Sequence, residues 1–214
     1  MAFQSAGQQS IVYENAYTKY KEAIDLFDKE KYGAAQKLFL EIHNELSGER
    51  SEIAVNAQYY EALCGLQLFN ADAESLLLQF VYEHPENPNS LKAYFDLGKY
   101  EFRKKRFRKV IQWFEKIDLY NLSNEELAEY YFKLGYSYFM REELELAKKS
   151  LFEIRDTETK YTSTAQYYYA HIAYLQKNYE TSLTYFRKIE QPAAIYFKSI
   201  YRHRQAGNFF ACYS

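Results

Sequence analysis

This 214-residue sequence contains few of the residues that tight turns, disulfides or membrane spans require. Seven Gly and three Pro are too few for a β-sandwich or barrel with many turns, so the composition favours an all-α chain. The two cysteines, Cys64 and Cys212, lie far apart and form no CxxC motif, and for Cys64 a buried thiol is favoured over a disulfide. Because no stretch approaches ~18 consecutive apolar residues, no membrane-spanning helix is expected.

Sequence signals of catalysis and of cofactor binding are absent as well. The chain contains no HExxH motif, no GxSxG motif and no glycine-rich phosphate-binding loop. Its four histidines, His43, His84, His171 and His203, share no metal-ligand spacing with Cys, Asp or Glu. We therefore expect a protein that is not an enzyme and that needs no cofactor or metal.

Positive and negative charges nearly balance, with a formal net charge of −2, so no global field attracts nucleic acid or an anionic membrane. One basic run, RKKRFRK from Arg103 to Lys109, has six cations in seven residues. Such a run could contact phosphate or an acidic partner, or act as a nuclear localisation signal. It is also typical of a solvated turn whose cations complement a helix C-terminus. We favour the turn and expect no nucleic-acid partner, because nucleic-acid binding would need basic stripes at several places along the chain and only this one is found.

Residues 130–154, YYFKLGYSYFMREELELAKKSLFEI, predict two helices joined by a turn at MREE. Apolar residues recur at helical spacing on both sides of that turn: Tyr131, Leu134, Gly135 and Tyr138 before it, and Leu144, Ala147, Leu151 and Ile154 after it. A glycine inside a helix costs ~1 kcal/mol relative to alanine. We therefore expect Gly135 to serve a close approach of the second helix at Ala147.

The same pattern recurs along the chain. A small residue is followed by an aromatic residue or Leu at nine, a small or aliphatic residue at twelve and a large apolar residue at sixteen. The small residues of the five copies are Ala23, Cys64, Gly98, Gly135 and Ala170, which lie 34 to 41 residues apart. The copy at Cys64 fits least well, and its boundaries are the least defined.

This pattern resembles the tetratricopeptide repeat (TPR), a helix-turn-helix unit of about 34 residues with W-x2-L-G-x2-Y followed by A-x3-F. The best match is found at Tyr131, Leu134, Gly135, Tyr138 and Ala147, whereas Leu151 replaces the usual Phe. The resemblance implies an all-α, right-handed superhelical α-solenoid. Stacking is required because one helical hairpin cannot bury its apolar face alone.

From these repeats we expect an unstructured N-terminal segment at 1–10 and an array of about five TPR-like hairpins at 11–190. An incomplete sixth repeat or a C-terminal helical tail follows at 191–214. Ser90 is a candidate helix N-cap, and Ser123 with Glu126 predicts a capping box. The aromatic C-terminal end favours truncation of a longer array and suggests self-association through that end, since terminal repeats need a polar outer face.

In the TPR family the ligand groove is lined by the residues three before, one after and four after the small residue. These positions are mostly aromatic here, except in the weak copy, which has Glu61, Gly65 and Leu68. The resemblance implies a partner-binding groove that consists of Tyr20, Phe27, Phe95, Lys99, Phe102, Phe132, Tyr136, Phe139, Tyr167, His171 and Tyr174. Lys99 and Arg103 would then contact acidic groups of a bound segment. The alternative is that these aromatic side chains only pack between successive first helices.

Two functions follow from this organisation. The first is a non-catalytic scaffold that binds a peptide or protein segment in the aromatic groove. The second is a structural or assembly module that acts through end-to-end stacking, with the groove idle. The stretch HPENPNSLKAYFDLG resembles repeats of bacterial envelope-assembly and Tol-Pal-associated proteins, which favours a periplasmic or cell-envelope setting over the cytoplasm. No motif identifies the partner.

Overall fold

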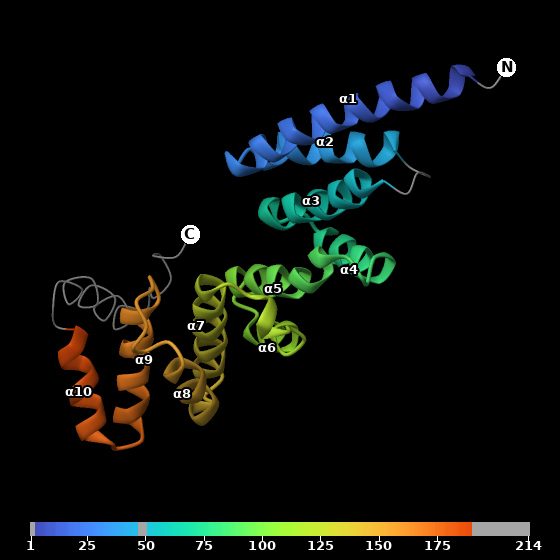
Figure 1. Ribbon diagram of the computed structural model, residues 1–214. Coiled ribbons are helices and arrows are strands. Elements are labelled where there is room, and N and C mark those ends of the chain that lie inside the picture. The colour runs from blue at the N-terminus through green and yellow to red at the C-terminus, as the bar shows by residue number, and fades with distance from the viewer. Residues whose placement is uncertain (1–2, 47–50, 190–214) are drawn as a thin grey trace. The chain divides into compact units, whose positions relative to one another are not determined.

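The computed structural model describes residues 3–46 and 51–189, and these residues form ten α-helices, one short 3-10 helix (η1, Leu119–Asn121) and no β-strand (Figure 1). The α-helices follow one another as five helix-turn-helix pairs: α1 (Phe3–Asp28) with α2 (Tyr32–Glu45), α3 (Glu52–Leu68) with α4 (Ala73–Glu83), α5 (Pro88–Arg103) with α6 (Phe107–Phe114), α7 (Asn124–Met140) with α8 (Leu144–Phe152), and α9 (Thr162–Leu175) with α10 (Tyr179–Ile189). The two members of a pair are its first and second helix.

The chain divides into two compact units, residues 1–100 and residues 101–214. The boundary falls inside α5, so the third pair belongs partly to each unit. In the first unit α2 packs against α1 and α3, and α3 packs against α4. In the second unit α8 packs against α7 and α9, and α9 packs against α10. Contacts between sequence neighbours are the means by which stacked hairpins share a core.

Four of the five turns within the pairs have the same geometry. The second helices begin nine residues after the small residue, as the repeat alignment predicts, at Tyr32, Phe107, Leu144 and Tyr179. Two residues before each start, a residue other than glycine adopts the left-handed conformation: Glu30 (φ 58°), Lys105 (φ 59°), Glu142 (φ 63°) and Lys177 (φ 61°). The next amide then donates back into the first helix, as the Glu143 amide does to the Tyr138 carbonyl at 3.0 Å. This is the hydrogen bond of a Schellman C-cap.

The second pair has the same C-cap but a longer turn. Phe69 takes the left-handed conformation (φ 59°), and the Asn70 amide donates to the Gly65 carbonyl at 3.0 Å. Helix α4 begins only at Ala73, so this turn is longer than the others. A Cβ at Gly65 would lie 3.1 Å from the Cβ of Ala73, which places the close approach at Gly65, one residue after the predicted Cys64.

The expected close approach at Gly135 is confirmed. A Cβ on this residue would lie 2.8 Å from Cγ of Leu151 and 3.2 Å from the carbonyl oxygen of Ala147. Leu151 and Ala147 are both 0% exposed and belong to one apolar cluster with Phe132, Tyr168 and other residues of α7 and α9. The missing side chain of Gly135 therefore provides the space in which α8 is seated.

Helix ends agree with the sequence at one site and differ at two. At α7 the hydroxyl of Ser123 and the carboxylate of Glu126 form the predicted capping box. Ser90 is not an N-cap: α5 begins at Pro88, a favoured first helical residue, and the Ser90 hydroxyl donates to the His84 carbonyl at 2.6 Å. The first helix starts at Phe3, before the predicted start at residue 11, because the intervening sequence has no proline to prevent it. The segment at 191–214 lies outside the described residues.

The basic run connects two helices, as expected. Arg103 ends α5, and Phe107 begins α6. The carboxylate of Glu101, which is 0% exposed, accepts a hydrogen bond from Nη1 of Arg106 at 3.5 Å and lies 3.8 Å from Nζ of Lys109. A buried carboxylate needs such partners, so part of the positive charge stabilises the turn itself. Within the described residues no helix is long and apolar enough to cross a membrane.

Substitution of glycine by alanine is expected to have opposite effects at two positions. Gly135→Ala should destabilise the protein by ~1–3 kcal/mol, because its methyl group would overlap Leu151 and Ala147. Gly33→Ala in α2 should stabilise it by ~0.5–1 kcal/mol, because a methyl group there meets nothing within 4 Å and alanine is the better helix former. Denaturant unfolding of both variants tests this, and a Gly135→Ala protein as stable as the parent would contradict the seating of α8.

The turn geometry makes a second stability prediction at Glu142, which is exposed and has φ 63°. Glu142→Val should destabilise by ~1–2 kcal/mol, because a β-branched residue fits the left-handed region poorly. Glu142→Gly should be neutral or stabilising by up to ~1 kcal/mol. Thermal melts of the pair provide the measurement. Equal melting temperatures for the Val and Gly variants would show that this turn is not held in the left-handed conformation.

Candidate functional site

Three residues of the predicted groove are core residues in the structure. Phe95, Phe132 and Phe139 are 2%, 5% and 9% exposed. Such side chains leave almost no area for a partner. For them the expectation of a binding surface is corrected in favour of the alternative, packing between helices.

Ring contacts in the second unit show where this aromatic surface is buried. Phe132 of α7 stacks on Tyr161 at 5.2 Å between ring centroids, and Phe139 meets Tyr168 of α9 at 5.1 Å. Tyr136 makes edge contacts with Phe102 at 5.6 Å and with Tyr168 at 5.1 Å. The aromatic residues of successive first helices thus pack against one another, and each such pair contributes ~0.5–1.5 kcal/mol beyond its buried area.

The cations of the predicted groove are already matched within the chain. Nζ of Lys99 lies 2.7 Å from Oδ1 of Asp96 and 4.7 Å from the ring centroid of Phe95. The hydroxyl of Tyr59 donates to the other oxygen of Asp96 at 2.7 Å. Lys99 therefore belongs to a network within the chain. This pairing weakens the expectation that Lys99 contacts an acidic group of a partner. Arg103 also has interactions within the chain.

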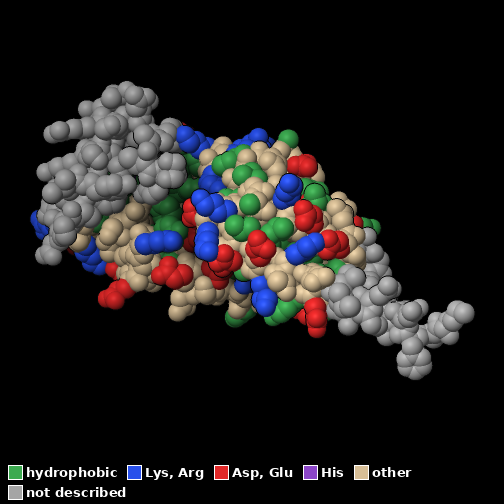
Figure 2. All heavy atoms as spheres, turned by 90° about the horizontal axis from the view of Figure 1, so that it is seen from above, with side chains coloured by type: hydrophobic (Ala, Val, Ile, Leu, Met, Phe, Trp, Pro, Cys, Tyr) green, Lys and Arg blue, Asp and Glu red, His purple; other side chains and the backbone are tan. Residues whose placement is uncertain are grey.

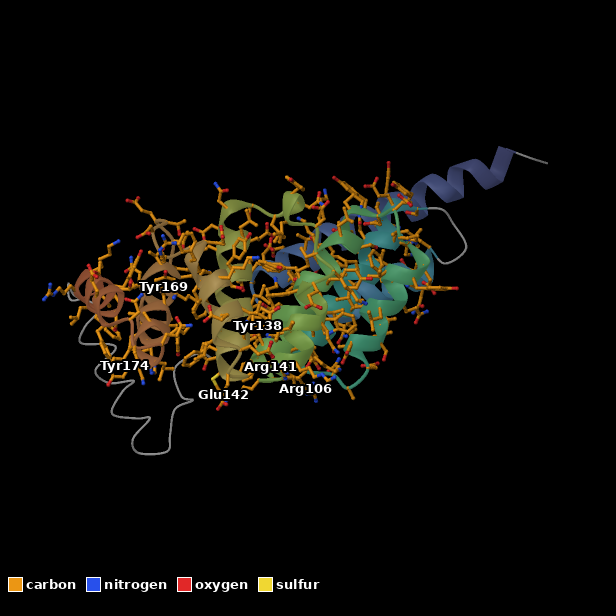
Figure 3. All side chains as sticks on the ribbon, turned by 90° about the horizontal axis from the view of Figure 1, so that it is seen from below. Arg106, Tyr138, Arg141, Glu142, Tyr169 and Tyr174 are labelled. Atoms are coloured by element: carbon orange, nitrogen blue, oxygen red, sulfur yellow. The ribbon has the colours of Figure 1, made fainter. Side chains whose placement is uncertain are left out.

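The remaining predicted residues keep some exposure. Tyr20, Phe27, Phe102, Tyr136, Tyr167 and His171 are partly buried. Tyr174, at the end of α9, is 57% exposed and contacts Tyr179 edge-on at 5.8 Å. In the second unit Tyr174 lies along the same edge as the turn residues Arg106, Arg141 and Glu142 (Figure 3). The predicted groove residues are therefore partly in the core and partly at the surface, and they do not form a continuous exposed groove within either unit.

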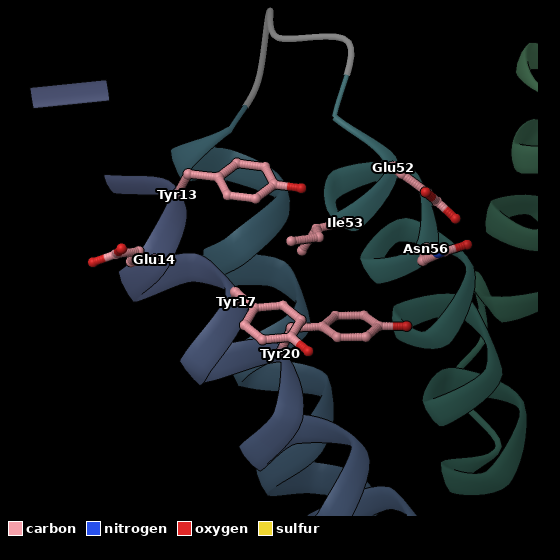
Figure 4. A pocket seen from close by; sticks show the side chains of 7 residues that line it. All are labelled: Tyr13, Glu14, Tyr17, Tyr20, Glu52, Ile53 and Asn56. Atoms are coloured by element: carbon pink, nitrogen blue, oxygen red, sulfur yellow. The ribbon is translucent and has the colours of Figure 1, made fainter. Parts of the chain in front are cut away.

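A hollow of about 480 Å³ lies between α1 and α3, the first helices of two consecutive pairs (Figure 4). It is lined by Tyr13, Glu14, Tyr17, Tyr20, Glu52, Ile53 and Asn56. The three tyrosine side chains project from α1 toward α3, Ile53 lies between the two helices, and Glu14 points away from the tyrosines at the rim (Figure 4). Of the predicted groove residues only Tyr20 contributes.

Tyr13 and Tyr17 were missed by the family pattern, but the sequence contains a signal for them. With Tyr20, Ile24 and Phe27 they form one apolar stripe at spacings of four and three. They lie ten and six residues before the small residue Ala23. The other four copies have polar, charged, small or proline residues there: Ala54, Pro88, Glu125 and Lys160 at ten, and Gln58, Lys92, Glu129 and Thr164 at six. Tyrosine at both positions is therefore peculiar to the first pair.

The hollow has acidic and neutral polar groups but no basic lining residue. Burial, together with Tyr60 and Glu52, raises the pKa of Tyr20 to about 12, so its hydroxyl is neutral at physiological pH. Oδ1 of Asn56 accepts a hydrogen bond from Nδ2 of Asn89 at 2.9 Å, which holds this amide in place. Tyr13 and Tyr17 are 45% and 49% exposed. The rings, amide and carboxylates of the hollow can bind and orient a group of a ligand.

Other chemical candidates do not form a site in the described part of the chain. Burial raises the pKa of the Cys64 thiol to about 12, as expected for a structural cysteine. Residues 3–46 and 51–189 contain no group of three or more His, Cys, Asp and Glu residues that could hold a metal ion. On the face in Figure 2, basic and acidic side chains are interspersed, so no charge of one sign dominates that surface.

Comparison with known proteins confirms the fold. No protein-family model and no curated protein sequence matches the chain. MamA of Desulfovibrio magneticus RS-1, from residue 41 to its end, is 13% identical over 81% of this chain and 92% of that chain, with a TM-score of 0.64. The apo form of RapI is 14% identical over 92% of this chain and 78% of its own, with a TM-score of 0.68.

A putative kinesin light chain of Podospora anserina with nearly identical TPR-like repeats gives a TM-score of 0.62 at 13% identity, over 86% of this chain and 97% of that chain. At such identities a structural likeness establishes the fold and not the activity. The chain has the all-α architecture of TPR-like helical repeats, as its sequence pattern predicts.

Burial predicts that two aromatic residues of the first helices differ sharply in their effect on stability. Phe132→Ala should cost ~3–5 kcal/mol, because the side chain is 5% exposed and stacked. Tyr17→Ala should cost less than ~1 kcal/mol, because the ring is 49% exposed. Chemical denaturation of the two variants measures the difference. If Phe132→Ala unfolds as late as Tyr17→Ala, Phe132 is a surface residue and the groove prediction regains support.

Proposed function

We propose that this protein is a non-catalytic protein-interaction scaffold, and that the hollow between α1 and α3 binds a segment of a partner protein. The observation that carries the proposal is the pair Tyr13 and Tyr17. These residues depart from the repeat pattern, are nearly half exposed, and face a hollow of about 480 Å³. Stacking of hairpins does not require tyrosine at either position, since the other four copies have other residue types there.

The chemistry of the lining suits a protein ligand. Tyrosine is enriched at binding hot spots because its ring provides apolar area and its hydroxyl provides a hydrogen bond. Ile53, which is 8% exposed, gives the hollow an apolar floor. Hollows of this volume are within the range that binds small groups or single side chains of a partner. Tyr20, predicted from the sequence, is partly buried, whereas Tyr13 and Tyr17 are exposed.

Fold-level analogy supports the same class of function. The structural neighbours are TPR-like repeat proteins, and repeat architectures offer extended surfaces to other proteins. The partly exposed Phe27, Tyr167, His171 and Tyr174 are further candidate contacts. A cell-envelope setting, taken from the repeats that the sequence resembles, is part of the proposal.

A different observation favours the alternative of an assembly module. The last described pair exposes four large apolar residues, Tyr174, Leu175, Tyr179 and Leu183, at 57%, 48%, 54% and 55%. Exposed apolar patches of this kind often mark interaction sites. End-to-end stacking would bury them against another copy of the chain.

Site-specific photocrosslinking in the source cell distinguishes the two functions. A benzophenone amino acid is introduced separately at Tyr17, at Leu183 and at the control Tyr82 on α4, which is 86% exposed and lies outside the hollow. The scaffold predicts that position 17 captures one defined partner, identified by mass spectrometry, which position 82 does not capture. Position 17 is suitable because its truncation should leave the fold intact.

Capture of the same proteins at positions 17 and 82 would overturn the scaffold at this hollow, because exposure alone would then explain both. Crosslinks between copies of this chain from position 183, with none from position 17, would favour the assembly module. Capture of a partner at position 17 that is lost in Tyr13→Ala would locate the partner at the hollow.

A further inference from the structure

We infer that the hollow between α1 and α3 selects a cationic side chain, lysine or arginine, in the segment that it binds. This inference deepens the proposed function and rests on it. The seven lining residues combine three tyrosine rings and two carboxylates with one amide and one apolar side chain, and none of them is basic. Aromatic faces beside carboxylates attract ammonium and guanidinium groups through cation–π and charge interactions.

The chain itself places cations on aromatic rings of its first helices. Nζ of Lys21 lies 4.6 Å from the ring centroid of Tyr17, one of the lining residues. Nζ of Lys133 lies 4.2 Å from the centroid of Phe102 in the second unit. The ring of Tyr17 thus already interacts with an ammonium group of the chain, and at 49% exposure it keeps surface for a partner's cation.

The acidic groups of the hollow are not neutralised by the described part of the chain. Glu52 is exposed in the first turn of α3, and Glu14 is exposed on α1. The nearby Lys19 pairs with Glu45 and not with a lining carboxylate. Glu52 lines the hollow together with Tyr20, and its charge contributes to the raised pKa of Tyr20.

The same groups disfavour the other occupants. An acidic side chain would be repelled by the carboxylate of Glu52 and would find no basic lining residue. A purely apolar side chain would be able to contact Ile53 and the rings, but it would gain nothing from the negative charge of Glu52. A lysine or arginine satisfies both requirements, because its aliphatic stem packs on apolar surface while its charged head reaches the rim.

Titration of the isotope-labelled protein with two probes tests the inference by NMR. The first probe is Nα-acetyl-lysine methylamide, and the second is Nα-acetyl-norleucine methylamide, which has a similar aliphatic chain and no charge. We expect the lysine probe to shift the backbone amides of Tyr17, Tyr20 and Asn56 at low salt, and the norleucine probe to shift them much less. Tyr17→Leu should weaken lysine binding about fivefold. Glu52→Gln should weaken it up to about fivefold, with added salt reducing the effect.

Tyr82→Leu is the matched control, because it removes an exposed tyrosine of the same unit outside the hollow, and it should leave the titration unchanged. Equal shifts from the lysine and norleucine probes would overturn cation selection and assign the hollow to an apolar side chain. Shifts that persist unchanged in both Tyr17→Leu and Glu52→Gln would place the lysine probe elsewhere. Cation selection fails in either case without affecting a partner captured at position 17, so the two proposals fail separately.

Discussion

Each hairpin in this protein depends on how closely its second helix can approach its first. Two helices have no interior of their own, so apolar side chains are buried only where the backbones come close and where a neighbouring hairpin covers the rest. At Gly135 the absence of a side chain leaves the space that Leu151 fills, against the backbone of Ala147. A single glycine therefore sets the depth at which the largest buried residue of α8 is seated, and the spacing of small residues along the chain repeats this device.

This constraint also shapes the turns and the use of aromatic residues. Helices that pack this closely are joined by a short connection, and in all five pairs a residue other than glycine in the left-handed conformation makes the reversal, as Lys105 and Glu142 do. Beside the crossing point, the space between successive first helices is wide enough for rings. Phe132, Tyr136 and Phe139 fill it together with Tyr161 and Tyr168. Much of the high aromatic content is thus explained by stacking, before any partner is considered.

The sequence predicted those features of the structure that follow from regular or local residue spacing. The repeat alignment located the starts of four second helices and the crossing at Gly135, and the S-x-x-E motif located the capping box at Ser123, because each depends on local spacing. It could not tell which aromatic rings are covered, since a ring at Phe132 is buried or exposed according to the neighbouring hairpin. It also missed Tyr13 and Tyr17, because the family's groove positions begin closer to the small residue. Ser90 failed as a cap for a further reason: Pro88 already begins the helix, so the serine hydroxyl bonds elsewhere.

What distinguishes a binding surface from a packing surface here is the comparison between copies of the repeat. A residue type that recurs at the same position in every copy is explained by stacking, because stacking is common to all copies. Tyrosine at 13 and 17 has no counterpart in the other copies, and rings that remain 45% and 49% exposed add little to a core. The charges of the two surfaces differ as well. Lys99 in the predicted groove is paired with Asp96, whereas Glu52 at the hollow is exposed and the lining contains no cation. The hollow between α1 and α3 is therefore aromatic and acidic, and both properties underlie the proposal of a basic partner.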